Sequence, residues 1–358
     1  MSLVATILGM VTLPVRAELP KITGKPVIDA PTLLDWPADQ GTVIPNLNDP
    51  TANLLNDVHA QIASCDLLLS TEGNFHPALK DIWPRYLARF KDQPLVNWLY
   101  TTSPPISFEQ MTHGVAQVGN IYVKCRPTVA IATRRVIEKL LEAGYTVEPA
   151  IPLLQDRGAV ILVKKGNPKR IRSVWDLARP GVRLVTPNPA LEPGALANYA
   201  ATLAGIAAND PQPPPGVSAG RLVDLIFNGG SRDPEKWLAG PRIHHRDLPW
   251  SVAFGKADAA IIFYHLGLYT QQTFPDQFDL VPLGGTLTDP QPLKGTVVQP
   301  RYIMRLQGDW TPRQKEAREG LVETLLSADF TRVLEKRGLL RPQGVGALTG
   351  TAKEPATP

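Results

Sequence analysis

The sequence predicts an α/β protein built on mostly parallel sheets. Apolar runs of strand length alternate with amphipathic segments of helix length along most of the chain. The 358 residues suffice for two domains or one large one, and a hydrophobic content of 43% is ordinary for a globular protein. The formal net charge of +4 is too small to favour nucleic acid or a membrane surface as a partner.

The N-terminus has the pattern of an export signal. The run LVATILGMVTLPV, residues 3–15, matches the length of a signal-peptide hydrophobic region and is too short to span a bilayer. The sequence VRA, residues 15–17, places small residues at the cleavage positions. No Lys or Arg precedes the run, so a misassigned start or a buried helix would also explain it. We expect residues 1–17 to be removed, giving a periplasmic chain that starts at Glu18.

The first part of the mature chain is expected to begin with an extended arm or loops, because residues 18–60 are rich in Pro, Asp and Asn. Strands are predicted after it at 65–70, 95–102 and 128–133. A helix is predicted through Leu79, Ile82, Leu87 and Phe90. Two more are expected to end at glycines, over 107–114 and 134–144.

The second part continues the alternation. Residues 161–163 are predicted as a buried strand that ends in a Gly-Asn-Pro turn, and Ser173 with Asp176 forms a capping box for a short helix. Further strands are expected at 182–187, 257–264 and 296–304, with a helix at 194–206 and a proline loop at 209–216. Two helices close the chain. The first has a capping box at Thr311 and Gln314, the second stops at Gly338, and residues 341–358 are expected to be a disordered tail.

No catalytic or metal-binding motif is present. Cys65 and Cys125 lack CxxC spacing, so they are either one disulfide of an exported protein or two buried apolar thiols. His244 and His245 are adjacent and are interpreted as a surface pair, because neighbouring side chains project differently and make a weak metal signal. We therefore expect neither an enzyme nor a metal or other cofactor, and a hydrolase or metal enzyme is the least favoured class.

Several motifs in a fixed order resemble type II periplasmic solute-binding proteins, most closely their molybdate-binding branch. They are KGNP at 165–168, SVWDL at 173–177, PGVR at 180–183, NP at 188–189 and GALANY at 194–199, followed by GKADAAIIFYHLGL at 255–268 and SADFTRVLEKRGL at 327–339. The resemblance covers residues 64 to 340. It implies two hinge-linked lobes, with 18–164 and 285–340 in lobe one and 165–284 in lobe two.

The resemblance also implies that the strand at 160–164 crosses from lobe one to lobe two. The basic residues beside this crossing are then read as a solvated turn, with contact to a transporter as the alternative. They are Lys164, Lys165, Lys169, Arg170 and Arg172.

The family grips its ligand between the lobes, at loops that follow strands and at helix N-termini, where backbone N–H groups attract anions. This places the ligand at segments 70–74, 101–103, 188–194 and 263–265. The alternative for Glu72 is an outward surface acid, and the alternative for Tyr264 is a core aromatic residue with its hydroxyl at the rim. The candidate ligand-binding residues are Ser70, Thr71, Glu72, Asn74, Thr102, Ser103, Tyr122, Asn188, Glu192, Gly194, Tyr264 and His265.

Departures from the family pattern decide the expected ligand. Glu72 and Glu192 would repel an oxyanion, and Pro104 with Pro105 removes a backbone donor. Aromatic bulk is added by Phe75, Tyr100, Phe108 and Tyr122. We therefore favour an organic or amphipathic ligand, such as a lipid or sterol, that a monomeric binding protein hands to a membrane transporter. The alternatives are a molybdate- or tungstate-type oxyanion carried to an ABC importer, or a periplasmic sensor subunit with the same fold.

Overall fold

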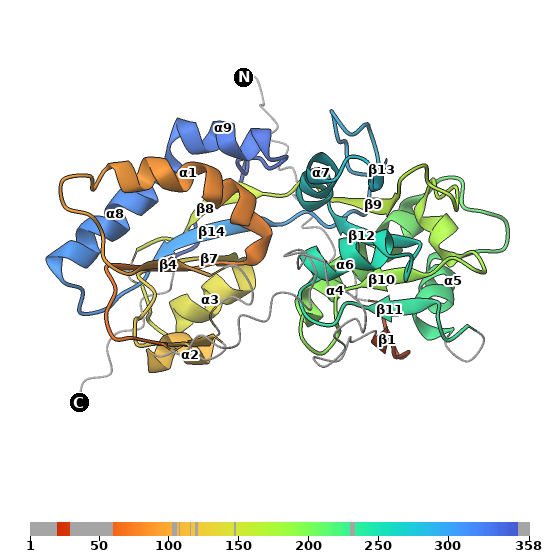
Figure 1. The fold of residues 1–358 in the computed structure, drawn as a ribbon. Helices are drawn as coiled ribbons and strands as arrows, with labels where there is room; N and C mark the ends of the chain where they lie inside the picture. The colour runs from red at the N-terminus through yellow and green to blue at the C-terminus, as the bar shows by residue number, and fades with distance from the viewer. Residues whose placement is uncertain are drawn as a thin grey trace, which may run out of the picture.

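The computed structural model describes residues 20–28, 60–101, 106, 108–114, 116–118, 121–146, 148–229 and 233–349. Their strands form a six-stranded, a five-stranded and a three-stranded sheet. Figure 1 shows the two larger sheets, each with its own helices, lying side by side as two lobes. The predicted two-lobed α/β fold is therefore confirmed. The predicted signal peptide at residues 1–17 lies outside the described residues.

The five-stranded sheet is the framework of lobe one. Its order is β4 (Trp98–Tyr100), β3 (Leu67–Ser70), β7 (Val129–Thr133), β14 (Pro300–Arg305) and β8 (Ile151–Gln155). The first three strands are parallel, and β14 runs antiparallel to both of its neighbours. Because side chains alternate along a strand, Leu67 and Leu69 pack with one group of helices and Leu68 packs on the opposite face. The first face carries α1 (His76–Ala88), α8 (Pro312–Leu326) and α9 (Ala328–Lys336), and the second carries α3 (Arg134–Glu142).

The six-stranded sheet is the framework of lobe two. Its order is β1 (Val27–Ile28), β11 (Trp237–Ala239), β10 (Leu184–Thr186), β12 (Ala259–Phe263), β9 (Ala159–Lys164) and β13 (Phe278–Pro282). The first four strands are parallel, whereas β9 is antiparallel to β12 and β13. Both large sheets are thus mixed, because each contains one strand that runs against its neighbours.

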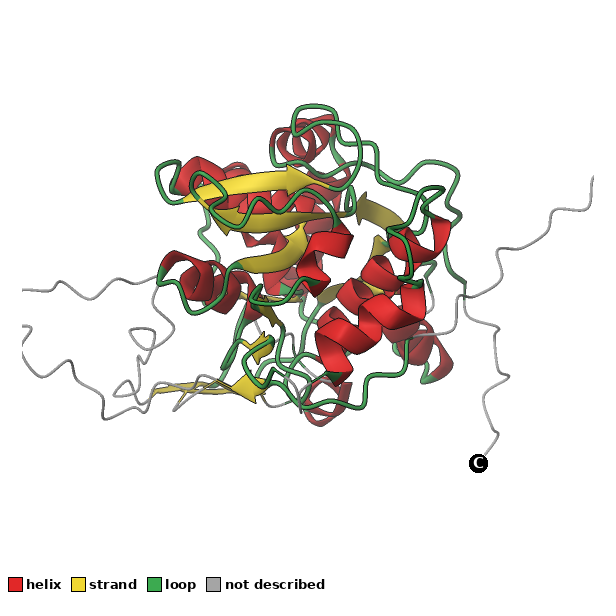
Figure 2. Ribbon diagram, turned by 90° about the vertical axis from the view of Figure 1, so that its right-hand side faces the viewer, coloured by secondary structure: helices red, strands yellow, loops and turns green. Residues whose placement is uncertain are grey.

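Helices lie on either side of the lobe-two strands in Figure 2, so the central strands are buried on both faces. This explains why β9 and β12 are continuous apolar runs in the sequence. The helices of this lobe are α4 (Pro193–Asn209), α5 (Ala219–Val223), α6 (His244–Ala253) and α7 (Tyr264–Thr273), with short turns at η2 (Val174–Ala178) and η3 (Asp224–Asn228). None of the helices described here is both long and apolar enough to cross a membrane.

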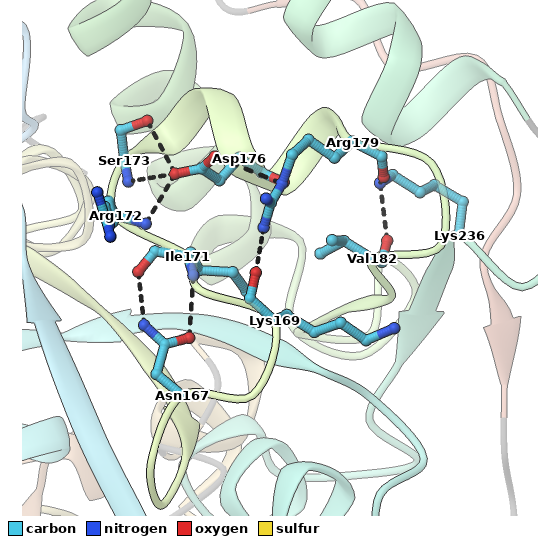
Figure 3. A network of polar contacts seen from close by, with 9 residues as sticks. All are labelled: Asn167, Lys169, Ile171, Arg172, Ser173, Asp176, Arg179, Val182 and Lys236. Atoms are coloured by element: carbon cyan, nitrogen blue, oxygen red, sulfur yellow. Dashed lines mark hydrogen bonds and ion pairs between the residues drawn. The ribbon is translucent and has the colours of Figure 1, made fainter.

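The corner after β9 is the basic turn of the sequence, and its polar groups bind one another (Figure 3). The Asn167 amide closes the turn by bonding both the N–H and the C=O of Ile171, at 2.9 and 2.7 Å. The predicted capping box of Ser173 and Asp176 is present at the start of η2. The buried Lys236 ammonium donates to the carbonyls of Arg179 and Val182, both at 2.7 Å.

Two of the five basic side chains of the turn have partners within lobe two. Lys165 pairs with Asp279 at 3.0 Å, and Lys169 donates to the carbonyl of Gly181 at 2.8 Å. These contacts fit the interpretation of a structural turn. The alternative, that this basic cluster binds a transporter, stays a prediction.

Two predicted boundaries need correction. The sequence placed residues up to 164 in lobe one, but β9 pairs with β12 and β13 and so belongs to the six-stranded sheet. The sequence also placed the start of the mature chain in lobe one, whereas β1 pairs with strand β11 of lobe two. Local sequence identifies a strand but not its partner, and the partner decides the lobe.

The expected disordered tail is wrong for its first residues. The Arg341 guanidinium donates to the carbonyls of Leu153, Leu325 and Ser327, and Leu348 pairs with Ala150 beside β8. This segment contains few apolar residues, so its composition gave no sign that its backbone and one arginine would be held by the sheet. Residues 350–358 lie outside the described chain.

Some elements had no clear sequence signal. The three-stranded sheet of β2 (Ala60–Ile62), β6 (Ile121–Val123) and β5 (Ala116–Val118) is made of very short strands beside α2 (Phe108–His113). Strand β11 also has only three residues, and α6 contains Pro249, which ordinarily argues against a helix. By contrast, the capping box predicted at Thr311 and Gln314 begins α8, and Gly338 ends α9 in the left-handed region at φ 75°.

One buried carboxylate joins the two chain crossings between the lobes. The first crossing, residues 156–158, links β8 to β9, and the second, residues 283–299, links β13 to β14. Asp156 is 3% exposed and accepts from the N–H groups of Gly158, at 2.9 Å, and Gln299, at 3.4 Å. Burial raises the pKa of Asp156 to about 6, against the opposing effects of Arg301 and these two N–H groups.

Cys65 and Cys125 form a disulfide, with their Cα atoms 6.0 Å apart. Both side chains are also buried. The sequence left a disulfide and two buried side chains as alternatives, and the structure shows both together. The bond joins the segments that lead into the neighbouring strands β3 and β7.

We expect replacement of both cysteines by alanine to lower the free energy of unfolding. The bond closes a loop with a sequence separation of 60, for which the chain-entropy relation gives about 4 kcal/mol. Chemical unfolding of the wild type and of the double variant, each with and without reductant, measures the effect. Reductant should destabilise the wild type and leave the double variant unchanged; an equal response of both proteins would contradict the prediction.

Candidate functional site

Four strand ends and four helix beginnings meet where the lobes face each other. In lobe one, β3 ends at Ser70 and leads through the turn η1 (Gly73–Phe75) into α1. In lobe two, β10, β11 and β12 lead into α4, α6 and α7. Parallel strands end at one edge of a sheet, so their loops gather at a crevice. The first N–H groups of each helix have no partner within the helix, which makes this crevice rich in backbone donors.

The lobes touch through an imidazole. His265, in the first turn of α7, is 3.1 Å through Nε2 from the carbonyl oxygen of Asn74 in η1. Its ring stacks between Phe75 of lobe one and Phe263 of lobe two, with ring centroids 5.8 and 5.7 Å away. The contact therefore ties the end of β3 to the end of β12.

Glu72 is held by an arginine from a distant strand. The Nε atom of Arg301, on β14, lies 3.2 and 3.3 Å from the two carboxylate oxygens, and Nη2 lies 3.3 Å from Oε2. The arginine side chain is 6% exposed and that of Glu72 is 21% exposed. Arg301 also lies over the Phe75 ring, 5.7 Å from its centroid. The carboxylate is thus neither an outward surface acid nor an uncompensated charge in the crevice.

Glu192 is held by hydrogen bonds within lobe two. It precedes α4, and its carboxylate accepts from the backbone N–H of His244 at 2.7 Å and from Nδ1 of the same residue at 2.9 Å. His244 is 2% exposed, so the expectation that His244 and His245 form a surface pair is wrong. They begin α6, and the fold turns that helix N-terminus into the crevice.

Several buried polar atoms around this crevice have no protein partner. They are Thr71 Oγ1, His244 Nε2, His245 Nδ1, Asp247 Oδ1 and His265 Nδ1. Buried polar side-chain atoms are ordinarily hydrogen-bonded, so a group of orphans in one place needs an explanation. A bound ligand or ordered water supplies the missing partners.

Positively charged side chains act on the histidines of the crevice. Burial lowers the pKa of His76, and Lys80 and Arg246 lower it further. The pKa of His245 lies well below its usual value because of burial and then because of His244, Arg246, His76 and His265. Burial disfavours a charge of either sign, whereas the positive charges of Lys80 and Arg246 favour a negative one.

The family model for bacterial extracellular solute-binding proteins matches residues 67–340, which is most of the chain. The protein belongs to this family. The predicted likeness to periplasmic binding proteins is thereby confirmed, and the matched residues include both lobes and the crevice between them.

This solute-binding protein has partial sequence relatives. The sulfate-binding protein of Escherichia coli is 39% identical over 79 residues, which make up 20% of this chain and 24% of that protein. The sulfate-binding protein of Salmonella typhimurium gives the same identity and coverage. The chain thus spans about a quarter of the length of these curated relatives.

Two solved structures are similar to this chain at low sequence identity, and the first of them shares its fold. The sulfate-binding protein SubI of Mycobacterium tuberculosis is 17% identical, with a TM-score of 0.52, and the match covers 78% of this chain and 86% of that one. The periplasmic molybdate-binding protein of Azotobacter vinelandii is 14% identical, with a TM-score of 0.49 and coverage of 77% and 100%.

Most of the predicted ligand-binding residues surround the crevice of this solute-binding protein, and their contact with a ligand stays a prediction. Ser70 and Thr71 are buried at the end of β3. The backbone of Thr71 exchanges two hydrogen bonds with the Thr101 hydroxyl, at 2.8 and 2.6 Å, which joins the ends of β3 and β4. Gly194, in the first turn of α4, has open space where a side chain would be. Asn74, Glu72, Glu192 and His265 complete the group through the contacts given above.

Two further predicted residues make structural contacts, and a role of either in ligand binding stays a prediction. The Asn188 side chain accepts from the N–H of Ala190 at 2.9 Å and shapes the turn before α4. The Tyr264 hydroxyl donates to the carbonyl of Leu287 at 2.6 Å, so this residue is a core aromatic, as its alternative interpretation had it.

Of the remaining predicted site residues, the structure describes only the backbone of Tyr122. Thr102 and Ser103 lie outside the described residues, together with Pro104 and Pro105. The backbone of Tyr122 belongs to β6 in the three-stranded sheet and not to a strand that ends at the crevice.

Sequence reasoning missed Arg301, His244, His245 and Arg246. An arginine inside the apolar strand at 296–304 is itself a signal, because a charge in a buried strand requires a partner. The two histidines and Arg246 gave no such signal, since α6 was not predicted. Across the residues that the structure describes, no three His, Cys, Asp or Glu side chains are grouped so that they could hold a metal ion.

We expect the Glu72–Arg301 pair to be strongly coupled. Removing one partner of a buried pair costs about 3–5 kcal/mol, and the partial exposure of Glu72 places the expected loss toward the lower end. Glu72→Gln, Arg301→Gln and the double variant, measured by chemical unfolding, form a double-mutant cycle in which the double variant should lose less than the sum of the single losses.

The surface pair of Arg89 and Glu323, with side chains 45% and 61% exposed, is the matched control for this cycle. Arg89→Gln should cost less than about 1 kcal/mol. Additive losses at Glu72 and Arg301, or a loss no larger than that of the control, would show that the pair is not coupled.

Proposed function

We propose that this protein binds an oxyanion, of the class that includes sulfate, molybdate and tungstate, between its lobes and delivers it to a membrane transporter of the ABC type. One observation carries the proposal: Glu72, one of the two acids that argued for an organic ligand, forms an ion pair with Arg301. The other acid, Glu192, accepts hydrogen bonds from the backbone N–H and from Nδ1 of His244. Neither carboxylate is left without a donor in the crevice.

The remaining groups of the crevice favour a negative ligand. The N-termini of α1, α4 and α6 supply backbone donors and the positive ends of helix dipoles. Arg246 and Lys80 add positive charge near His76. The partial relatives are named as sulfate-binding proteins, which supports the same ligand class for this chain.

The lipid or sterol hypothesis loses its support. The aromatic rings that suggested an apolar cavity are used in packing, because Phe75 stacks on His265 and Tyr100 packs on Trp83.

Export fits both the family and the disulfide. The family is extracellular by its description, and a disulfide persists in an oxidising compartment such as the periplasm. A signal peptide at residues 1–17 and a monomeric binding protein complete the proposal.

Calorimetry against sulfate, molybdate, tungstate and phosphate tests the ligand class, with vesicles of phospholipid and sterol as the competing class. We expect saturable binding of at least one oxyanion and no heat with vesicles. Arg301→Gln should weaken the binding about tenfold or more, because it leaves the Glu72 carboxylate uncompensated beside the anion. The double variant Glu72→Gln/Arg301→Gln should recover part of the loss. Saturable lipid binding without any oxyanion heat would refute the proposal.

Sulfate or molybdate affinity is expected to rise as the pH falls. An anion in the crevice raises the pKa values of His76 and His245, which lie below 6.5 in the free protein, so the complex takes up protons. Affinity therefore increases as the pH falls through the pKa values of the complex and levels off below those of the free protein. Titrations between about pH 5 and pH 8 measure this slope. His76→Asn and His245→Asn should flatten it and His113→Asn, on α2, should not; weaker binding in acid would contradict the prediction.

A further inference from the structure

Helix α7 of lobe two touches lobe one at a second place, next to the end of α9. Gly338 follows α9, and a Cβ atom added to it would lie 2.7 Å from Cε1 of Tyr264 and 3.2 Å from Cδ2 of Leu268, both on α7. Figure 1 shows the end of α9 beside α7, in agreement with these distances. The backbone of lobe one is thus packed directly on a helix of lobe two.

Arg337 adds a charged contact at the same place. Its guanidinium lies over the Tyr269 ring on α7, with Cζ 5.9 Å from the ring centroid, which is within the range of a cation–π interaction. Two hydrogen bonds to Asp81 on α1, at 2.8 and 2.7 Å, hold the guanidinium in place. Asp81 and Arg337 both belong to lobe one, so that lobe alone fixes the position of the cation. The contacts of Arg337 and Gly338 with Tyr264, Leu268 and Tyr269 are called the α7–α9 contact below.

Tyr264 places the α7–α9 contact at the hinge. Its hydroxyl donates to the carbonyl of Leu287 in the second crossing at 2.6 Å, and Cζ of Arg157 in the first crossing lies 5.9 Å from its ring centroid. The residue is 4% exposed, so these partners leave the ring little room to move away from α9. Helix α7 is also packed closely on the lobe-two sheet, because a Cβ atom on Gly267 would lie 2.7 Å from Cγ2 of Val160 on β9. A displacement of α7 at this contact therefore moves lobe two about the hinge.

The α7–α9 contact is separate from the ligand loops. Leu268 and Tyr269 lie on the second turn of α7, and Arg337 and Gly338 lie at the C-terminal end of α9, whereas the crevice is formed by helix N-termini. We propose that the α7–α9 contact holds the lobes together independently of the ligand and thereby sets the fraction of molecules that are ready to bind. The apparent dissociation constant is the intrinsic one divided by this fraction, so the contact changes the affinity for every ligand by the same factor. This inference goes beyond the proposed function and does not depend on the ligand class.

Small-angle scattering of the protein in a buffer without oxyanions tests the contact directly, with a matched pair of glycine variants. Gly338 and Gly144 each follow a helix and lie in the left-handed region, at φ 75° and 73°, so alanine strains both backbones alike. At Gly144 no other described part of the chain lies within 4 Å of the added Cβ, whereas at Gly338 the Cβ meets Tyr264.

We expect Gly338→Ala to raise the radius of gyration and Gly144→Ala to leave it unchanged, with the folding of both variants checked by circular dichroism. A radius of gyration that is unchanged in Gly338→Ala, or that rises equally in both variants, would overturn the inference.

Variants of Tyr269 provide a second test that leaves the backbone of both helices intact. Tyr269→Phe keeps an aromatic ring beneath the guanidinium, whereas Tyr269→Leu removes it. Loss of the cation–π contact lowers the fraction of molecules with joined lobes. We therefore expect Tyr269→Leu to raise the radius of gyration and to weaken sulfate and molybdate binding by the same factor, about two- to fivefold. Tyr269→Phe should match the wild type in both measurements.

The outcomes for Tyr269→Leu separate this inference from the proposed function. Weaker binding of one anion and not of the other would mean that Tyr269 acts on the ligand, and an unchanged radius of gyration would mean that the ring does not hold the lobes. Either result refutes the inference. Absence of binding by sulfate, molybdate, tungstate and phosphate would overturn the proposed function alone, because the scattering measurement reports on the lobes without any ligand.

Discussion

The ion pair between Glu72 and Arg301 is the constraint on which the crevice depends. It joins the loop after β3 to β14, the strand on which the chain returns to lobe one, across a sequence separation of 229. Arg301 also covers the Phe75 ring and donates to the carbonyl of Gln299 at 3.3 Å. The N–H of Gln299 in turn reaches Asp156 in the other crossing, so one guanidinium connects the ligand loop to the hinge.

Charge compensation changes the chemistry of the crevice. Glu72 and Glu192, taken alone, repel an anion; held by Arg301 and His244, they instead orient a guanidinium and an imidazole. The ring of His265 adds a contact between the lobes without adding charge. What remains is a crevice lined by imidazoles and helix N-termini.

The ligand hypothesis drawn from the sequence lost its basis for a definite physical reason. It counted the acids within each loop, and their partners lie on other elements, 229 residues away for Glu72 and 52 for Glu192. The same limit applies to Tyr264, whose hydroxyl is used by Leu287, and to the lobe assignment of β9, which depends on its neighbours in the sheet. Each of these errors concerns a partner that is distant in sequence.

The sequence by itself determined the features that depend on local chemistry. Apolar periodicity located most strands and helices, the capping boxes at Ser173 and Thr311 located helix starts, and Gly144 and Gly338 located helix ends. The order of motifs determined the family and the general position of the crevice. Only the tertiary structure decided which charges are compensated, that α6 turns His244 inward, and which ring nitrogens lack a partner. These facts depend on contacts between distant segments, and burial sets their energetic weight.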